Sequence, residues 1–408
     1  MAKREVRNLL VGLDIGTTKC VAVIGQIMPE GTVDIVGHGE HASRGLNRGE
    51  VVNIDATVQA IRRAVENAEH MANCRAQSVY VGISGGHIQS GNSLGLAAIR
   101  QREVTERDVD AAIETAKAIP MPADRRILHV IPQEFVIDGQ RGIQDPVGQY
   151  GVRLEANVHV IHGSSSSIQN LSKCVEACGL RVDRLILQQL AAAEAVLMPD
   201  EREAGVCAID IGGGTSDIAV FKGGAIRHTA VLPVAGNHVT NDISMAFRIP
   251  AQQAEEIKIQ FGCAMPQFAA AHEEIEIRGA GDGTRRLSRL TLAEVIKPRY
   301  EELFRFVRRE LQRSEWLDAI PTGLVLSGAA VQMPGVAELA EEVFDLPVRI
   351  GVPQHVTGID EVVSSPAYAT AAGLLLYGRQ AQPRNDTARN TGAGFALQRI
   401  GEWLRGNF

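Results

Sequence analysis

The sequence predicts an α/β protein made of two homologous halves that face one another, with a small α+β subdomain inserted into the first half and an amphipathic helix at the C-terminus. Three observations support this fold class. One short phrase occurs twice along the chain, the pattern of elements changes between residues 85 and 163, and residues 394–408 show helical apolar spacing after a polar stretch.

The repeated phrase first appears as Leu9-Leu-Val-Gly-Leu-Asp-Ile-Gly-Thr-Thr-Lys19 and returns as Gly205-Val-Cys-Ala-Ile-Asp-Ile-Gly-Gly-Gly-Thr-Ser-Asp217. Each copy is an apolar run that ends in Asp-Ile-Gly, followed by a small polar turn and a second apolar run. Two apolar runs around a short glycine-containing turn are typical of a β-hairpin. The repeat therefore predicts one such hairpin in each half.

The remaining elements follow from apolar periodicity and end signals. In the first half we expect strands at Thr32–Gly37 and Val79–Ile83 and a helix at Ile54–Met71. In the second half the capping-box pattern Thr291-Leu-Ala-Glu294 predicts the start of a long helix that reaches about Gln312 and is broken early by Pro298. A short strand is expected at Thr322–Leu326.

Residues 85–163 contain a different pattern, with a short acidic-start helix from Val104, a long alternating strand at Ile127–Ile137 and a strand at Ala156–Ile161. We interpret this block as an inserted α+β unit. The serine run Ser164–Ser167 is either a phosphorylation site or, as we favour, a hinge and N-cap for the helix Ile168–Ala177. The expected divisions are 1–84 and 164–204 for the first half and its hinge helix, 85–163 for the insert, 205–377 for the second half with an outer subdomain at about 230–315, 378–393 for a flexible linker and 394–408 for the amphipathic helix.

The chain has 408 residues, a net charge of −7 and 22% charged residues, which predicts a folded protein of roughly two to three domains. The acidic balance argues against nucleic acid as a partner. Neither a run of about 18 apolar residues nor a signal-peptide pattern occurs, so we expect a cytoplasmic protein that does not cross a membrane. Six scattered cysteines without a C-x-x-C spacing, including the pair Cys174 and Cys178, are interpreted as reduced packing residues and not as metal ligands.

Glycine-rich turns bring backbone N–H groups close to anions, and each turn here follows an aspartate, Asp14 or Asp210. A carboxylate beside a phosphate is repulsive unless a cation lies between them, so the pair predicts magnesium, held through water. The alternative is two ordinary hairpins with Asp in the turn. A Walker loop and a dinucleotide fingerprint are both excluded, because those glycine loops open a helix whereas each turn here runs into a strand.

These two phrases resemble the phosphate motifs of the actin superfamily, which implies ATP as the ligand. Val325-Leu-Ser-Gly-Ala-Ala330 is similar to the superfamily's adenosine motif, with Ala329 in place of a usual glycine, and Ala254-Glu-Glu-Ile-Lys258 is similar to its ribose-binding helix or is merely a charged amphipathic helix. The resemblance assigns ATP contacts to Gly16, Thr17, Thr18, Lys19, Gly212, Gly213, Gly214, Thr215, Gly236, Asn237, Glu255, Lys258, Gly328 and Ala329. It assigns catalysis to Asp14, Asp210 and Gln188, and magnesium to Asp14 and Asp210.

Within the superfamily the chain resembles the FtsA family of bacterial cell-division proteins over nearly its whole length. The similarity includes Gly45-Leu-Asn-Arg-Gly-Glu-Val-Val-Asn-Ile54, Val81-Gly-Ile-Ser-Gly-Gly-His87 and, in the insert, Ile131–Gly139, Asp145–Gly148 and Arg153–Glu155. The resemblance implies an ATP-binding protein that forms filaments at midcell on the cytoplasmic face of the inner membrane. It also implies that the protein tethers the C-terminal tail of the tubulin-like protein FtsZ and recruits other divisome proteins. On that match Arg299 and Glu302 are candidate FtsZ contacts, although they are equally consistent with solvent-facing charges.

The C-terminal helix places apolar residues at steps of three and four, with flanking arginines. Its position beyond a polar linker favours a peripheral lipid surface over a core or a partner groove, and the candidate membrane contacts are Leu397, Ile400, Trp403, Leu404 and Phe408. Five arginines against Asp386 and Glu402 give residues 379–408 a net charge of +3, which leaves −10 for residues 1–378. Anionic lipid would therefore attract the tail and repel the body.

Two other functions stay open at this level. A small-molecule kinase of the same superfamily would need a carboxylate base and a substrate domain, and neither can be identified in the sequence. A pilus-assembly relative would share the insert but is expected to lack the lipid helix. Any enzymatic activity is expected to be a weak ATPase at most.

Overall fold

The computed structural model describes residues 9–270, 273–278 and 284–382. The predicted C-terminal helix, with Leu397, Ile400, Trp403, Leu404 and Phe408, lies outside the described residues. Helix α11 (Ala369–Gln380) extends into the predicted linker, because its buried Leu374–Leu376 stretch continues to Gly378, which packs against the ring of Tyr80. The expectation that the linker begins at residue 378 is therefore wrong by three residues.

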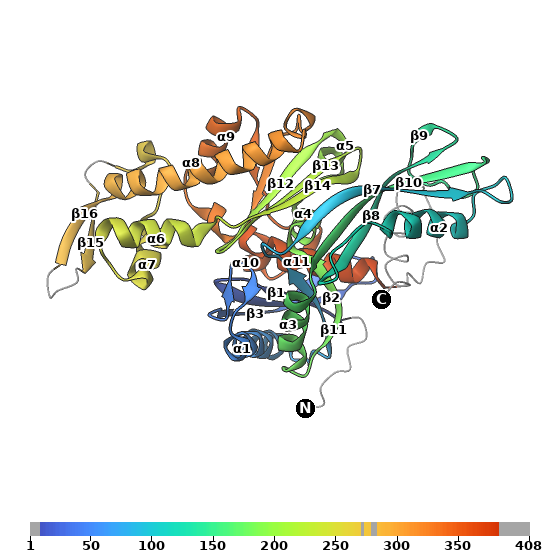
Figure 1. The fold of residues 1–408 in the computed structure, drawn as a ribbon. Coiled ribbons are helices and arrows are strands. Elements are labelled where there is room, and N and C mark those ends of the chain that lie inside the picture. The colour runs from blue at the N-terminus through green and yellow to red at the C-terminus, as the bar shows by residue number, and fades with distance from the viewer. Residues whose placement is uncertain (1–8, 271–272, 279–283, 383–408) are drawn as a thin grey trace.

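Two sheets of matching topology form the centre of the molecule (Figure 1). In each sheet a three-stranded antiparallel unit, which contains the repeated hairpin, is continued by two parallel strands. The first sheet has the order β11-β6-β1-β2-β3-β19 and the second has the order β14-β13-β12-β17-β18. The α/β class and the two homologous halves predicted from the repeat are confirmed.

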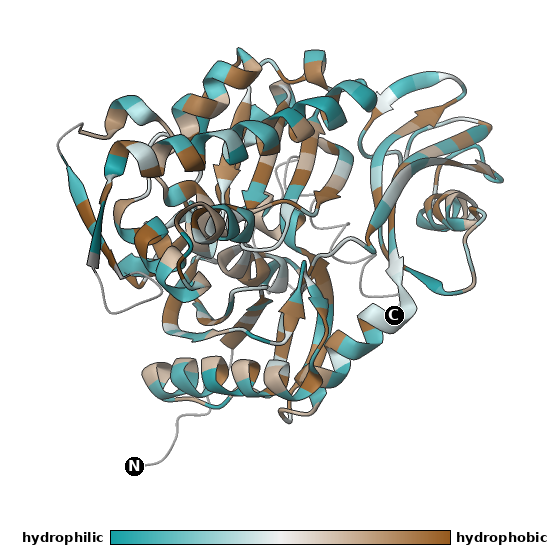
Figure 2. Ribbon diagram, turned by 60° about the vertical axis from the view of Figure 1, so that its left-hand side comes forward, coloured by the Kyte–Doolittle hydropathy of each residue, from teal (hydrophilic) through white to brown (hydrophobic). Residues whose placement is uncertain are grey.

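The bounds of these strands are β1 Leu9–Ile15, β2 Lys19–Ile27, β3 Val33–Ala42, β6 Ser78–Ile83, β11 Arg181–Leu187, β12 Val206–Ile211, β13 Ser216–Lys222, β14 Ala225–Leu232, β17 Leu324–Ser327, β18 Val348–Ile350 and β19 Val356–Gly358, with the small pair β4 Leu46–Asn47 and β5 Glu50–Val51 beside them. Apolar residues concentrate on the two central sheets, whereas the outer helices carry mixed residues (Figure 2). Helices α1 (Ile54–Ala72) and α3 (Ser165–Glu176) pack on one another beside the first sheet. Ser164 caps α3 by accepting the N–H of Ser167, so an N-cap within the serine run is confirmed, but the predicted helix start at Ile168 is wrong because the helix begins at Ser165.

Two helices lie between the halves, α4 (Gln188–Val196) and α11, and they pack closely against each other. The shorter elements of the hinge and second half are α5 Pro199–Ala204, α9 Val336–Phe344, α10 Asp360–Val363 and the 3-10 turns η1 Pro266–Phe268, η2 Leu317–Ala319, η3 Ala329–Gln332 and η4 Pro366–Tyr368. The outer part of the second half consists of α6 Gly236–Phe247, α7 Ala251–Phe261, α8 Arg289–Arg313 and the hairpin β15 Glu274–Arg278 with β16 Thr284–Ser288.

Helix α8 differs from its prediction at two points. It begins at Arg289 after the N-cap residue Ser288, so the capping-box start at Thr291 is wrong. It also continues through Pro298, although proline lacks the N–H for one helical hydrogen bond. Helix α8 has a continuous stripe of buried side chains, which includes Ile296 and Tyr300 on either side of the proline. Burial of this stripe outweighs the lost hydrogen bond.

The inserted unit is an α+β layer, as predicted, in which a four-stranded sheet of order β7-β10-β8-β9 is covered by α2. Its elements are β7 Gln89–Ala98, α2 Glu106–Lys117, β8 Arg125–Ile137, β9 Gln140–Ile143 and β10 Arg153–Ser164. None of the six cysteines, all of which lie in the described part of the chain, forms a disulfide, and Cys174 is fully buried in the first core, which agrees with a packing role. Among the described residues, no helix is both long and apolar enough to cross a membrane.

Acid should destabilise the fold through His129, a buried side chain at the base of the inserted sheet. Its Nε2 accepts the N–H of Leu187 at 3.1 Å, and burial, with a smaller effect of the Arg184 charge, lowers the pKa of His129 from 6.5 to about 4. The unfolded chain therefore binds more protons between these values, so stability is present above pH 6.5 and is lost as the pH falls. Each pH unit in this window costs up to about 1.4 kcal/mol.

We expect the variant His129→Gln to be less acid-sensitive than the natural chain, because a glutamine oxygen can accept the same N–H without titrating. Urea unfolding of both proteins at pH 6.5 and pH 5 measures the effect. The loss of unfolding free energy should be smaller in the variant by up to about 2 kcal/mol. Equal losses in the two proteins would contradict this assignment.

Candidate functional site

The turns of the two repeated hairpins meet where the two halves face each other. A Cβ atom built on Gly213 would lie 2.3 Å from Cγ2 of Thr18, and one built on Gly214 would lie 2.4 Å from Oγ1 of Thr17. Real Cβ contacts are not this short, so both positions require glycine. Gly16, at the tip of the first turn, donates its N–H to the carbonyl of Lys19 at 2.9 Å and closes the hairpin.

Asp14, at the end of β1, is partly buried behind the first turn. Gln188, the first residue of α4, donates its Nε2 to Oδ1 of Asp14 at 2.8 Å. Burial and then the charge of Asp210 raise the pKa of Asp14 to about 7, while Lys19 and the Gln188 hydrogen bond oppose this rise. The structure thus brings together the three side chains that the sequence assigned to catalysis.

Asp210, at the corresponding position of β12, receives two hydrogen bonds of 3.0 Å. Ser327 donates to its Oδ1, and Thr370, near the start of α11, donates to its Oδ2. Burial raises the pKa of Asp210, and these two donors lower it. Both aspartates are therefore partly buried carboxylates that are each held by the first turn of a helix between the halves.

A third carboxylate belongs to Asp217 on β13, the last residue of the second repeated phrase, to which the sequence assigns no role. Its Oδ1 accepts from Ser84 Oγ at 2.5 Å and its Oδ2 accepts from Thr215 Oγ1, in the second glycine turn, at 3.0 Å. Burial is the largest of the effects that raise the pKa of Asp217 to about 7, and the nearby charges of Asp210 and Asp14 add to it. An aspartate inside an otherwise apolar strand is the sequence signal that could have identified it.

The second glycine turn is hydrogen-bonded to the N-terminus of α6. The N–H groups of Gly236 and Asn237 donate to the carbonyls of Gly212 and Gly213 at 3.1 and 2.9 Å. Lys258 of α7 donates from Nζ to Thr240 at 2.9 Å and to the Gly236 carbonyl at 3.3 Å.

The side chain of Glu255 bonds both Thr240 and Lys258, with 2.7 Å between its Oε2 and the lysine Nζ. Gly328 has φ +94°, and a Cβ there would lie 2.4 Å from the Ile211 carbonyl and 2.8 Å from Asp210 Oδ1. Glycine is therefore required at this position. The next residue, Ala329, begins the 3-10 turn η3.

Three residues with predicted contacts, Lys19 to ATP and Arg299 and Glu302 to FtsZ, form ion pairs within the chain. Lys19 forms a 2.7 Å ion pair with Glu40 on the neighbouring strand and lies 4.2 Å from the ring centroid of Tyr368. Arg299 binds both carboxylate oxygens of Asp242 on α6, at 2.6 and 2.9 Å, and contacts Glu302. Lys19 thus lies beside the first turn, and Arg299 and Glu302 lie on helix α8 of the outer subdomain.

The arrangement is suited to a bound polyphosphate and a hydrated cation. Glycine-rich turns can bring backbone N–H groups close to an anion, and the absence of a Cβ on Gly213 and Gly214 lets the second turn approach the first. Two carboxylates with raised pKa values, Asp14 and Asp210, favour either a proton or a nearby cation. Within the described ranges, no three His, Cys, Asp or Glu side chains are grouped so that they could hold a metal ion directly.

Comparison with protein families gives two matches along this chain. A family model described as "Cell division protein FtsA" matches residues 207–373, and one described as "SHS2 domain inserted in FTSA" matches residues 85–162. "Cell division protein FtsA" of Pseudomonas aeruginosa is 51% identical over 100% of both chains. The protein of the same name from Escherichia coli K12 is 45% identical, also over 100% of both.

Solved structures of low identity share the fold. The "PilM-PilN type IV pilus biogenesis complex" has a TM-score of 0.67 at 18% identity, covering 94% of this chain and 100% of that one. MreB5 of Spiroplasma citri bound to ADP has a TM-score of 0.55 at 16% identity, covering 91% and 96%. The "MamK double helical filament" has a TM-score of 0.53 at 14% identity, covering 91% and 99%. The likeness to full-length relatives and the matching insert show that the chain belongs to the FtsA family of cell division proteins.

Proposed function

We propose that this protein binds ATP with magnesium between its two halves, polymerises at the cytoplasmic face of the inner membrane, and tethers the FtsZ tail there. The observation that carries the proposal is the close approach of two glycine turns, each backed by an aspartate that is hydrogen-bonded to a helix between the halves. Relatives of the same fold support it, since MreB5 is described as bound to ADP or AMPPNP and MamK as a double helical filament.

In this proposal the chain's own groups hold and orient the nucleotide. The backbone N–H groups of the two turns contact its phosphates, Glu255 and Lys258 contact its ribose and base, and Gly328 lets the chain pass close to the adenosine. Lys19 would exchange its ion pair with Glu40 for a phosphate. Magnesium, when bound, would neutralise phosphate charge beside Asp14 and Asp210.

Hydrolysis would be slow. Gln188 carries an amide, which can orient a water molecule but cannot accept its proton, and its Nε2 is already engaged by Asp14. We therefore assign the protein a structural role, with weak ATPase activity at most. A coupled assay over common sugars and small acids that detected rapid phosphoryl transfer would overturn this assignment in favour of a small-molecule kinase.

The outer subdomain is the proposed docking site for the FtsZ tail, near Arg299 and Glu302 on α8. Their side chains are 26% and 46% exposed, so a partner can reach them although they are paired with each other. An acidic group of a bound tail would compete with Glu302 for the guanidinium, which prefers planar two-oxygen contacts. Recruitment of other divisome proteins at midcell is the remaining part of this proposal.

Removing residues 394–408 should abolish membrane attachment and leave ATP binding intact. Partial burial of the large apolar side chains in that helix stabilises binding by only several kcal/mol, so one helix attaches reversibly and a filament carries many. Co-sedimentation of the full-length and truncated proteins with acidic liposomes, with and without ATP and the FtsZ tail peptide, measures this. Neutral liposomes serve as the control, and unchanged sedimentation of the truncated protein would contradict the membrane assignment.

A further inference from the structure

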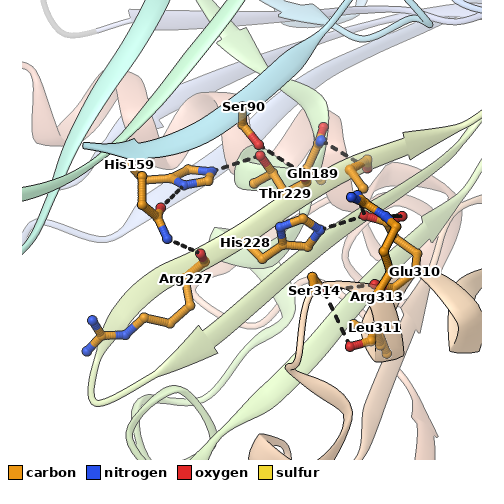
Figure 3. A network of polar contacts seen from close by, with 12 residues as sticks. Ser90, His159, Gln189, Arg227, His228, Thr229, Glu310, Leu311, Arg313 and Ser314 are labelled. Carbon is orange, nitrogen blue, oxygen red and sulfur yellow. Dashed lines mark hydrogen bonds and ion pairs between the residues drawn. The ribbon is translucent and has the colours of Figure 1, made fainter. Parts of the chain in front are cut away.

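The inserted sheet is joined to strand β14 of the second half by polar contacts, which we call the β14 seam (Figure 3). Ser90 Oγ donates to the Thr229 carbonyl at 2.9 Å, and His159 Nε2 pairs with Thr229 Oγ1 at 2.9 Å. Gln133 Nε2 donates to the Ile226 carbonyl at 2.8 Å. Asn92 completes the seam with a 3.3 Å bond to the carbonyl of Arg227.

Strand β14 is also held from its other side. Side chains alternate along a strand, so His228 points away from Thr229, toward helix α8. Its Nε2 lies 2.9 Å from Oε1 of Glu310 (Figure 3). Strand β14 is therefore hydrogen-bonded to the insert on one side and to helix α8 on the other.

Strands β13 and β14 both connect this region to the second glycine turn. Beyond its last residue Leu232, β14 leads to Gly236 and Asn237, whose N–H groups hold that turn. On β13, Asp217 binds Thr215 of the turn with one oxygen and Ser84 with the other. Ser84 directly follows β6 and begins the connection into the insert. Two connections, one through β14 and one through Asp217 and Ser84, therefore link the second glycine turn to the inserted subdomain over a few residues.

The base of the insert belongs to the first half. Ile88, Leu128 and Ile161 are buried in the first hydrophobic core. An apolar contact of this kind resists separation, whereas hydrogen bonds across a seam can be exchanged for water at little net cost. Ile226 of β14 is buried in the same core, but the insert is continuous in the chain with the first half, between β6 and α3, and is not continuous with β14. Rotation of the two halves would therefore act on the β14 seam.

We propose that the β14 seam couples the inserted subdomain to nucleotide binding, so that occupancy of the two turns and closure of the seam favour each other. The inference rests on the proposed ATP function, because a ligand held by both turns keeps the halves in the arrangement that the seam requires. By linkage, ATP then strengthens the seam and an intact seam strengthens ATP binding to the same degree.

Hydrogen exchange of the full-length protein tests the first direction. With ATP, amides in residues 225–232 and 89–98 should exchange at least about threefold more slowly than without it. Exchange that is unchanged or faster at both segments, in a protein that titration shows to be saturated with ATP, would overturn the coupling.

Affinity measurements on seam variants test the reverse direction. The double variant Ser90→Ala with Gln133→Ala should bind ATP about two- to tenfold more weakly. Ser93→Ala is the matched control, because Ser93 lies on the same strand and also donates to a carbonyl, that of Ala116 inside the insert, at 2.8 Å. Thr229→Val, which keeps the side-chain shape, gives a second seam variant if the double variant does not fold.

The outcomes separate this inference from the proposed function. Failure of the natural protein to bind ATP would overturn both. If every seam variant binds ATP as tightly as the natural protein does, only the coupling is overturned. Weaker binding in the seam variants but not in Ser93→Ala supports it.

Discussion

Replacing Gly214 with valine should lower ATP affinity by at least about 100-fold, because the new side chain would occupy the contact between the two turns. A Cβ at this position lies 2.4 Å from Oγ1, 2.9 Å from Cβ and 3.0 Å from Cγ2 of Thr17. Rotation of the threonine cannot relieve a contact with its own Cβ, so the turns must separate. Overpacking of this kind costs about 1–3 kcal/mol, and the separated turns can no longer share one phosphate chain.

Gly91→Val is the matched control, since a Cβ on Gly91 meets nothing within 4 Å. Isothermal titration with ATP and magnesium gives the affinities, and circular dichroism shows whether each variant is folded. A Gly214→Val protein that is folded and binds ATP normally would show that the phosphates do not lie between the turns. It would thereby remove the central observation behind the proposed function.

The hairpins and their aspartates could be predicted because the information is local. A strand, a glycine turn and a second strand are encoded within a dozen residues, and the repeat at Asp14 and Asp210 marks both halves at once. The same holds for the cap at Ser164, where the donor and acceptor lie three residues apart.

The parts that sequence reasoning missed depend on contacts between distant residues. Ser84 and Asp217 are separated by 133 positions, and Thr370 and Asp210 by 160, so no local pattern connects them. Helix α8 passes through Pro298 because tertiary burial outweighs a local preference. The β14 seam was missed for the same reason, since its partners come from the insert and the second half.

The two helices between the halves cross at a single glycine. Gly373, in the middle of α11, is buried against α4, and a Cβ there would lie 1.7 Å from the carbonyl oxygen of Ala191 and 2.4 Å from its carbonyl carbon. Each helix holds one aspartate at its first turn, through Gln188 for Asp14 and through Thr370 for Asp210. The crossing therefore sets the separation of the two aspartates.

Gly373→Ala should destabilise the protein by about 3 kcal/mol or more and lower its melting temperature by about 3 °C or more. Helix propensity alone predicts the opposite sign, a gain of up to about 1 kcal/mol, so calorimetry of the natural and variant proteins distinguishes the two effects. Gly91→Ala, which meets no neighbour, should leave the melting temperature nearly unchanged. ATP affinity should fall in Gly373→Ala as well, because α11 cannot move off α4 without pulling Thr370 away from Asp210. A stabilised variant would mean that the helices are not in contact at this glycine.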